Sequence, residues 1–344
     1  MACMLFRTPH SPDSGVTKSS AVPPPLGVYV PTVTFFQSST PPGARQAPLD
    51  IETQIKHSVH LAKNGVRGLV LLGSTGEAIH LSRTERSDLI SGVRKGLTGA
   101  GFTDYPIIAG VLTNSVDDAL EWLDDVAKAG AQWGLVLAPG YFGGAANQEN
   151  LREWYKLVAD SSPIPILIYN YPGVTNNILV SLETYTELAA HPNIVGCKMS
   201  HGNVSHHLQV SLDPAIDHDN FRVYSGFGQQ LGPIVLFGAA GVIDGLAAIY
   251  PATVARLFEL SIKRPVEPEN LKEIQRLQFI VSRAEEMVGK WGIVGIKEGI
   301  YQVLKMGNLE GGRLPLKGRM PKGEWEAWSV ATNAMKENEL VFEK

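Results

Sequence analysis

A lysine lies within a short apolar run near the middle of the chain. Residues 191–203 read HPNIVGCKMSHGN, and Lys198 is enclosed by the run IVGCKM. A buried ammonium group without partners is costly, so lysine is almost never fully buried. Either the run ends at Lys198 and the side chain reaches water, or burial lowers the pKa of the amine so that it can attack a carbonyl carbon.

Two hydroxyl groups lie between glycines in the motif GSTGE, residues 73–77. Ser74 and Thr75, with the free backbone N–H groups of such a turn, suit a carboxylate or a phosphate. The alternative is an ordinary turn between a strand and a helix. No GK[ST] follows the motif, and no GxGxxG opens a helix after the first predicted strand. A nucleotide-dependent enzyme therefore lacks support.

Two tyrosines stand where apolar runs end, Tyr169 in IPILIYNYP and Tyr141 in APGYF. A phenol at the end of a strand can relay protons. Each ring could instead cap the core with its hydroxyl in water. Together with Lys198 and the GSTGE hydroxyls, however, the two tyrosines fit one mechanism: an amine nucleophile, a phenolic proton relay and hydroxyls that hold an anion.

Two other sets of residues compete for the chemistry. Lys297, in IVGIKEGIY, resembles Lys198 locally, but its apolar neighbours have helical spacing, so we expect a solvated lysine on a helix. His201, His206 and His207 could bind a divalent metal for a metal-dependent aldolase. At helical spacing His201 points away from the other two, and no HxH or HExxH motif is present, so no metal is expected.

The elements that must position these groups alternate along the chain. Eight short β-branched runs each precede a longer amphipathic run, within about 235 residues, the usual size of a (β/α)8 barrel. Continuous apolar strands between helices imply a parallel sheet covered on both faces. Active sites of such barrels lie at the C-terminal ends of the strands, where GSTGE, APGYF, YNYPG, CKMSHG and GVIDG occur.

The chain therefore divides into a disordered segment 1–26, a (β/α)8 barrel over 27–263 and a helical extension over 264–344. Within the extension we expect separate helices at 270–287, 292–307 and 324–338.

Composition is that of an ordinary globular protein: 344 residues, 44% hydrophobic, 19% charged, with a net charge of −4. This mildly acidic balance, without a basic tract, excludes an electrostatic nucleic-acid binder. No apolar stretch approaches the roughly 20 residues of a membrane span. The first residues make a poor signal peptide and a doubtful transit peptide, so the expected location is cytoplasmic, with a mitochondrial one left open.

GSTGE, YNYP and the GCK strand end resemble, in order and spacing, the dihydrodipicolinate synthase / N-acetylneuraminate lyase superfamily over residues 27–315. These proteins are imine-forming, pyruvate-handling aldolases and lyases on a (β/α)8 barrel with a C-terminal helical extension. The resemblance implies that Lys198 forms the Schiff base and that Tyr169 relays the proton. Ser74 and Thr75 would hold the carboxylate of the pyruvyl group.

The resemblance implies further roles around these residues. Tyr141 would complete the proton relay, often across a subunit contact, while Gly226 and Ile243 would line the pyruvate pocket. Ser200 would reach a substrate hydroxyl. It also implies no cofactor beyond the covalent imine on Lys198, a small 2-keto-3-deoxy acid and pyruvate as ligands, and a homo-oligomer, either dimer or tetramer.

Two positions depart from the dihydrodipicolinate synthase pattern. Val174 stands two residues after the YNxP proline, where those synthases place an arginine that binds the carboxylate of the aldehyde substrate. Ser74 replaces the first threonine of GTTGE. The runs GLVLLGSTGEA, PIPILIY, HPNIVGCK and GQQLGP instead resemble the fungal 2-keto-3-deoxy-L-galactonate aldolases of galacturonate breakdown.

The predicted reaction is cleavage of L-threo-3-deoxy-hexulosonate to pyruvate and L-glyceraldehyde. At the barrel mouth Ser200, His201 and Asp244 would meet the hydroxyls of a neutral polyol aldehyde. The alternatives are a 4-hydroxy-2-oxoglutarate aldolase, a condensation like that of dihydrodipicolinate synthase and, outside catalysis, a sugar-acid sensor.

Overall fold

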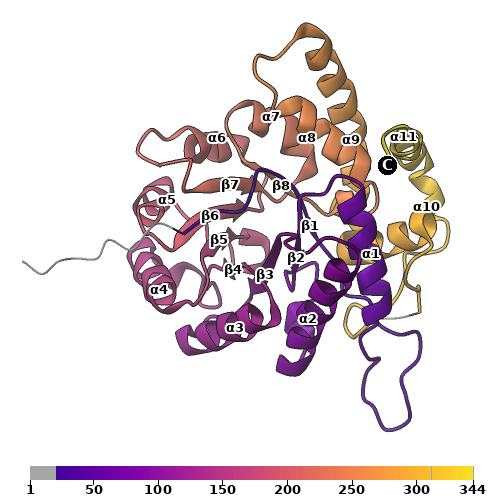
Figure 1. Cartoon of the computed structure of the whole chain (residues 1–344), viewed down its shortest axis with the longest axis horizontal. Coiled ribbons are helices and arrows are strands. Elements are labelled where there is room, and N and C mark those ends of the chain that lie inside the picture. The colour runs from indigo at the N-terminus through magenta and orange to yellow at the C-terminus, as the bar shows by residue number, and fades with distance from the viewer. Residues whose placement is uncertain (1–20, 311, 344) are drawn as a thin grey trace, which may run out of the picture.

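The computed structural model describes residues 21–310 and 312–343, and its centre is a closed barrel of parallel strands (Figure 1). Each strand pairs with the next along the chain, and the last closes the ring by pairing with the first. The predicted (β/α)8 barrel is therefore confirmed. The strands are β1 (Gly27–Pro31), β2 (Gly68–Leu71), β3 (Ile107–Val111), β4 (Trp133–Leu137), β5 (Ile166–Asn170), β6 (Ile194–Met199), β7 (Arg222–Ser225) and β8 (Gly241–Ile243).

A helix follows every strand and covers the outside of the barrel (Figure 1). In the third, Ser115 caps the N-terminus by accepting a hydrogen bond from the backbone of Asp118, and Gly130 ends it with φ of 108°. The helices are α1 (Ile51–Lys63), α2 (Arg83–Gly99), α3 (Val116–Ala129), α4 (Gln148–Ser161), α5 (Leu182–Ala189), α6 (Val204–Leu212), α7 (Leu231–Leu236) and α8 (Pro251–Ser261).

Two apolar layers stabilise the barrel. The larger lies between the strands and the helices, and the smaller fills the barrel interior. Because side chains occupy the interior, the barrel is no pore, and space for a ligand remains only beyond the strand ends. The interior layer includes Tyr29, Val70, Ile108, Leu135, Leu167, Tyr169, Val195, Tyr224 and Ile243.

Residues 21–26 close the opposite, N-terminal end of the barrel. Trp133 donates a hydrogen bond of 2.9 Å to the carbonyl of Val22, and Tyr224 donates one of 3.0 Å to that of Pro24. This part of the segment 1–26 is therefore ordered, which corrects the prediction of disorder. The sequence signal was its proline content, which reports local conformation and not the carbonyl groups that the barrel interior binds. The remainder of the segment, 1–20, lies outside the described residues.

A β-bulge in β6 decides which way its side chains point. Between the first two register pairs of β5 and β6, β6 advances by two residues while β5 advances by one. The extra residue, Val195, changes the side-chain alternation after it. Lys198 consequently lies in register with Tyr169 and points into the barrel, whereas Cys197 and Met199 join the apolar layer beneath the helices.

The chain beyond the barrel is helical, as predicted, and its first two expected helices follow one another across a break at Gly292. The range labelled α9 (Pro268–Leu304) contains the predicted segment 270–287 and all but the last three residues of 292–307, and the φ of 52° and ψ of −133° at Gly292 between them are not helical. It packs on α8 and reaches over the barrel mouth. Two shorter helices follow, α10 (Glu324–Ala327) and α11 (Ser329–Phe342). None of the helices in the described part of the chain has the length and apolar character needed to cross a membrane.

Candidate active site

A cavity of about 680 Å³ opens at the C-terminal ends of the strands, between the loops that follow them and α9. The sequence predicted eight site residues on six different segments, and the structure places all of them on the wall of this cavity. Their chemical roles stay predictions. The eight are Ser74, Thr75, Tyr141, Tyr169, Lys198, Ser200, Gly226 and Ile243.

Lys198 is the buried cation of the cavity. Only 5% of the residue is exposed, and burial lowers the pKa of its amine from the ordinary 10.5 to about 7. The negative charge of Asp244 acts in the opposite direction but is the weaker influence. A substantial fraction of the amine is therefore neutral near pH 7, and a neutral amine has the lone pair needed to attack a carbonyl carbon.

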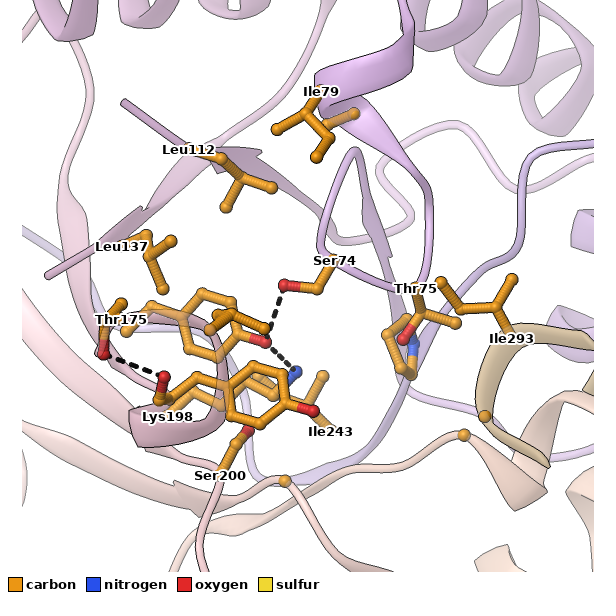
Figure 2. Close-up of a pocket in the computed structure, with 18 of the residues that line it drawn as sticks. Ser74, Thr75, Ile79, Leu112, Leu137, Thr175, Lys198, Ser200, Ile243 and Ile293 are labelled. Atoms are coloured by element: carbon orange, nitrogen blue, oxygen red, sulfur yellow. Dashed lines mark hydrogen bonds between the residues drawn. The ribbon is translucent and has the colours of Figure 1, made fainter. Parts of the chain in front are cut away.

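The Tyr169 hydroxyl lies between Lys198 and the GSTGE turn. It is 3.5 Å from the Lys198 Nζ and 3.3 Å from the Ser74 Oγ, and Figure 2 shows Ser74 and Lys198 directed toward the same space. Burial raises the pKa of Tyr169 to about 12, so the group is a neutral phenol at physiological pH. Amine, phenol and serine hydroxyl thus form a continuous path for a proton.

An ion pair with α9 holds the GSTGE turn in place. Glu77 is buried with a left-handed φ of 52°, and its carboxylate accepts hydrogen bonds from Lys297 and, at 3.3 Å, from the His80 ring. This backbone turn presents Ser74 and Thr75 to the cavity. Lys297 is on a helix, as predicted, but it is not solvated: only 16% of its side chain is exposed, because it reaches down to Glu77. It does not line the cavity.

Tyr141 lies at the rim and not beside the amine. Its residue is 74% exposed, and its ring makes an edge-to-face contact with Phe142. The backbone is held in place, since its N–H donates to Asn114 and its carbonyl accepts from Asn176. Among the described residues the exposed ring makes no hydrogen bond to the Tyr169 hydroxyl, and a role in the proton relay stays a prediction.

Ser200 and Gly226 face each other across the ends of β6 and β7. A Cβ atom on Gly226 would lie 2.1 Å from the Ser200 Oγ, so only glycine leaves room for this hydroxyl. Ser200 and Ile243 are both buried and lie beside Lys198 in Figure 2. The site floor thus combines one hydroxyl with an apolar wall next to the amine.

The three histidines cluster, contrary to the prediction that His201 points away from the others. The His201 ring centroid is 5.2 Å from that of His206 and 4.6 Å from that of His207, although His201 precedes helix α6 and the other two lie on it. Both ring nitrogens of His207 already lie within 3.0 Å of backbone carbonyl oxygens. No group of three or more metal-ligating residues occurs among the described residues. His201 also does not line the cavity.

Sequence reasoning missed the acidic residue of the cavity wall, Glu285. It is the only carboxylate on the wall that the described residues form, and Lys198 is the only lysine, arginine or histidine there. Val174 is on the wall, at the position where the dihydrodipicolinate synthases place an arginine. No arginine from another loop of the described chain lines the cavity in its place. A signal existed: Val281, Glu285 and Val288 share one face of α9, and a carboxylate in such a buried stripe is unusual.

The fold is a (β/α)8 barrel with a buried lysine, whose pKa burial lowers, at the end of strand six. The model of the dihydrodipicolinate synthetase family matches residues 38–283, and the chain belongs to that family. The predicted resemblance is thereby confirmed, and so is the prediction of an aldolase-type enzyme at the level of the family.

Relatives within the family differ in their named substrates. The chain is 36% identical to a probable mitochondrial 4-hydroxy-2-oxoglutarate aldolase of Emericella nidulans, covering 80% of this chain and 84% of the relative. It is 33% identical to an L-threo-3-deoxy-hexylosonate aldolase of Hypocrea jecorina, covering 85% and 90%. A dihydrodipicolinate synthase of Acinetobacter baumannii, solved with pyruvate, superposes with a TM-score of 0.78 at 25% identity over 90% of this chain and 99% of that one.

Proposed function

We propose that the protein is a Schiff-base aldolase that cleaves a 2-keto-3-deoxy sugar acid, L-threo-3-deoxy-hexulosonate, to pyruvate and L-glyceraldehyde in galacturonate breakdown. The observation that carries the proposal is the buried amine of Lys198, with a pKa of about 7, 3.5 Å from a phenol. The family supports the aldolase chemistry, and the Hypocrea jecorina relative supports the substrate.

In this mechanism the neutral amine of Lys198 attacks C2 of the keto acid, and uptake of one proton with loss of water leaves a protonated imine. The Ser74 and Thr75 hydroxyls hold the C1 carboxylate. Because Tyr169 is a neutral phenol, it relays the proton: it takes the proton of the C4 hydroxyl as it passes its own toward Ser74, while the C3–C4 bond breaks, the aldehyde leaves and the bonding electrons form an enamine. The proton is then available for C3, and hydrolysis of the imine releases pyruvate and the free amine.

The imine is tested by trapping it. Pyruvate with borohydride should reduce the imine irreversibly and add mass to the peptide that contains Lys198, as measured by mass spectrometry. The internal control is Lys297, which is also partly buried but bonded to Glu77 outside the cavity. A label on Lys297, or an active enzyme that takes up no label, would contradict the assignment.

Substrate choice follows from the charges on the cavity wall. A second carboxylate in the substrate would enter a cavity whose described lining residues include the carboxyl group of Glu285 and Val174 but no cation other than Lys198. Burying an unpaired anion is costly, whereas an arginine at position 174 could bind it bidentately. We therefore expect a much higher kcat/KM for L-threo-3-deoxy-hexulosonate than for 4-hydroxy-2-oxoglutarate, and no condensation of aspartate semialdehyde with pyruvate.

The Emericella nidulans relative makes 4-hydroxy-2-oxoglutarate cleavage the second candidate. Measuring pyruvate release from both substrates separates the two, and Val174→Arg provides a matched variant. In that variant the ratio of the kcat/KM values for L-threo-3-deoxy-hexulosonate and 4-hydroxy-2-oxoglutarate should fall, because the new arginine improves use of 4-hydroxy-2-oxoglutarate, which carries two carboxylates. A wild-type preference for 4-hydroxy-2-oxoglutarate would refute the first candidate.

The remaining proposals concern cofactors, assembly and location. We expect no cofactor, so chelators should leave activity intact; a loss of activity that a divalent metal restores would contradict this.

A homo-oligomer, dimer or tetramer, is supported by the exposed apolar side chains Ile79, Tyr141 and Phe142 near the cavity mouth. The proposed location is cytoplasmic, with the mitochondrial location in the name of the Emericella nidulans protein as the alternative.

A further inference from the structure

Two carboxyl groups meet in a buried position between the barrel and the helical extension. Asp244 directly follows β8, and Glu285 comes from α9. Gly228, in the loop after β7, lies against both: a Cβ atom there would be 2.5 Å from Glu285 Oε1 and 2.9 Å from Asp244 Oδ1. The absence of a side chain at Gly228 therefore lets the two oxygens approach from different elements.

These two oxygens lack hydrogen-bond partners among the described groups. Asp244 Oδ1 and Glu285 Oε1 are both inaccessible to solvent and unpaired, while Asp244 Oδ2 accepts the N–H of Ala247 at 3.1 Å. Two adjacent carboxylates in a dry site do not both ionise. One proton between Oε1 and Oδ1 satisfies both atoms and leaves a single negative charge.

The proton belongs on Glu285. Its burial, followed by the charge of Asp244, raises the pKa of Glu285 well above its usual range. Asp244 keeps two acceptor oxygens in use, one toward Ala247 and one toward the Glu285 hydroxyl. The Glu285 hydroxyl is thus the donor of the pair, and Asp244 Oδ1 is its acceptor.

The pair lies beside the amine. Asp244 follows Ile243 of the cavity wall, Glu285 is on that wall, and Asp244 is the charged group that favours the protonated form of Lys198. The other titratable group that faces Lys198 is Tyr169 on β5. Around the pair, the loop with Gly228 and the turn 246–248 contribute no titratable side chain.

We propose that Asp244 and Glu285 form a one-proton carboxyl pair that supplies the buried counter-charge for the cationic imine on Lys198. Glu285 is a positioning residue, since it acts by holding the Asp244 carboxylate. The inference rests on the proposed Schiff-base function. When the neutral amine and a ketone combine, one proton is taken up and one water leaves, so a positive charge appears on a nitrogen that burial disfavours. A fixed negative charge nearby stabilises that product.

The experiment measures imine formation with pyruvate and borohydride as a function of pH and of pyruvate concentration. In Glu285→Gln the amide still donates to Asp244, and the negative charge of the pair stays. The pH at which imine formation falls off on the acid side (the acid limb) should therefore stay unchanged, and the half-saturating pyruvate concentration should remain within about twofold of wild type. In Asp244→Asn, Glu285 could ionise and take over the charge. The double variant Asp244→Asn/Glu285→Gln, which has no carboxylate at the pair, is therefore decisive.

The double variant should show two changes. Loss of the negative charge lowers the pKa of Lys198 further, so the acid limb should move down by about one pH unit. At pH 9, where the amine is neutral in both proteins, half-saturation should need about tenfold more pyruvate, because the imine has lost its counter-charge. The control is Glu339→Gln, a buried carboxylate that caps α8 through Thr253 and does not line the cavity. It should change neither quantity.

Unchanged trapping in the double variant would overturn the inference, as would a Glu285→Gln profile shifted as far as that of the double variant. If the double variant does not fold, infrared spectra decide. Wild type at pH 8 should show the carbonyl stretch of a neutral carboxylic acid that Glu285→Gln lacks, and absence of that band would overturn the shared proton. If wild type itself is never trapped at Lys198, the Schiff-base function fails instead.

Discussion

Replacing Lys198 by methionine is expected to abolish cleavage of L-threo-3-deoxy-hexulosonate. Methionine matches the length of the buried side chain but has no lone pair on nitrogen, so no imine forms. Removal of a covalent nucleophile lowers turnover by on the order of 10⁴–10⁶-fold. The measurement is pyruvate release under saturating substrate, with borohydride trapping as the parallel readout. Retention of more than about 1% of wild-type turnover would contradict the assignment.

The same variant should be more stable than wild type, which separates lost chemistry from lost folding. The pKa of Lys198 is about 7 in the folded chain against an ordinary 10.5, so between these values the unfolded chain binds a proton that the folded chain lacks. Wild-type stability therefore rises with pH across this window, and the full penalty applies below it. At pH 8 Lys198→Met should raise the free energy of unfolding by on the order of 3 kcal/mol.

Two features make this stability test specific. The advantage of Lys198→Met over wild type should shrink as the pH approaches 10.5. Lys198→Arg, which keeps a permanent cation at the same position, should be equally inactive but less stable than wild type. Urea titrations at two pH values measure both. An advantage of the methionine variant that does not change with pH would argue that the amine is solvated.

Removing the Tyr169 hydroxyl is expected to give the second largest effect. Tyr169→Phe deletes the oxygen that lies 3.3 Å from Ser74 and 3.5 Å from Lys198 and leaves the ring in place. A positioned acid–base group contributes about 10²–10⁴-fold, so turnover should fall by that factor. Imine trapping with pyruvate should remain detectable, because the amine is intact.

Tyr155→Phe is the matched control for this experiment. Tyr155 is equally buried and donates a hydrogen bond of 3.0 Å to Val136, but it does not line the cavity. We expect both variants to lose comparable stability, about 1 kcal/mol for one buried hydrogen bond. Only Tyr169→Phe should lose turnover. A Tyr169→Phe enzyme within about twofold of wild type would make this tyrosine a packing residue.

Much of the fold was predictable because its signals are local. Each strand of the barrel is a short apolar run, and each helix shows apolar residues at helical spacing with a polar cap such as Ser115. The parallel arrangement then places every strand end at one rim, and the motifs at those ends, GSTGE and GCK, meet without further information. Lys198 and Tyr169 could therefore be assigned to one site from the sequence.

The corrections concern contacts between distant segments. Lys297 reads locally as a surface lysine, and only the buried Glu77, 220 residues away, explains its place. His201 lies in the loop between β6 and α6, outside the helix, so helical spacing does not predict its position. The pairing of Asp244 with Glu285 depends on where α9 crosses the barrel mouth, and a single helix stripe cannot specify that position.

The bulge in β6 has a consequence for which pairing register between β5 and β6 the chain adopts when it folds. If β6 paired with β5 without the bulge, so that Val195 took a regular place opposite Leu167, Cys197 would face the cavity and Lys198 would lie under the helices among aliphatic side chains. An ammonium group there has no partner, so that slipped pairing is strongly disfavoured. The residue assigned to the chemistry thus also discriminates against the wrong strand register, and a neutral replacement such as Lys198→Met would remove this safeguard while stabilising the correct fold.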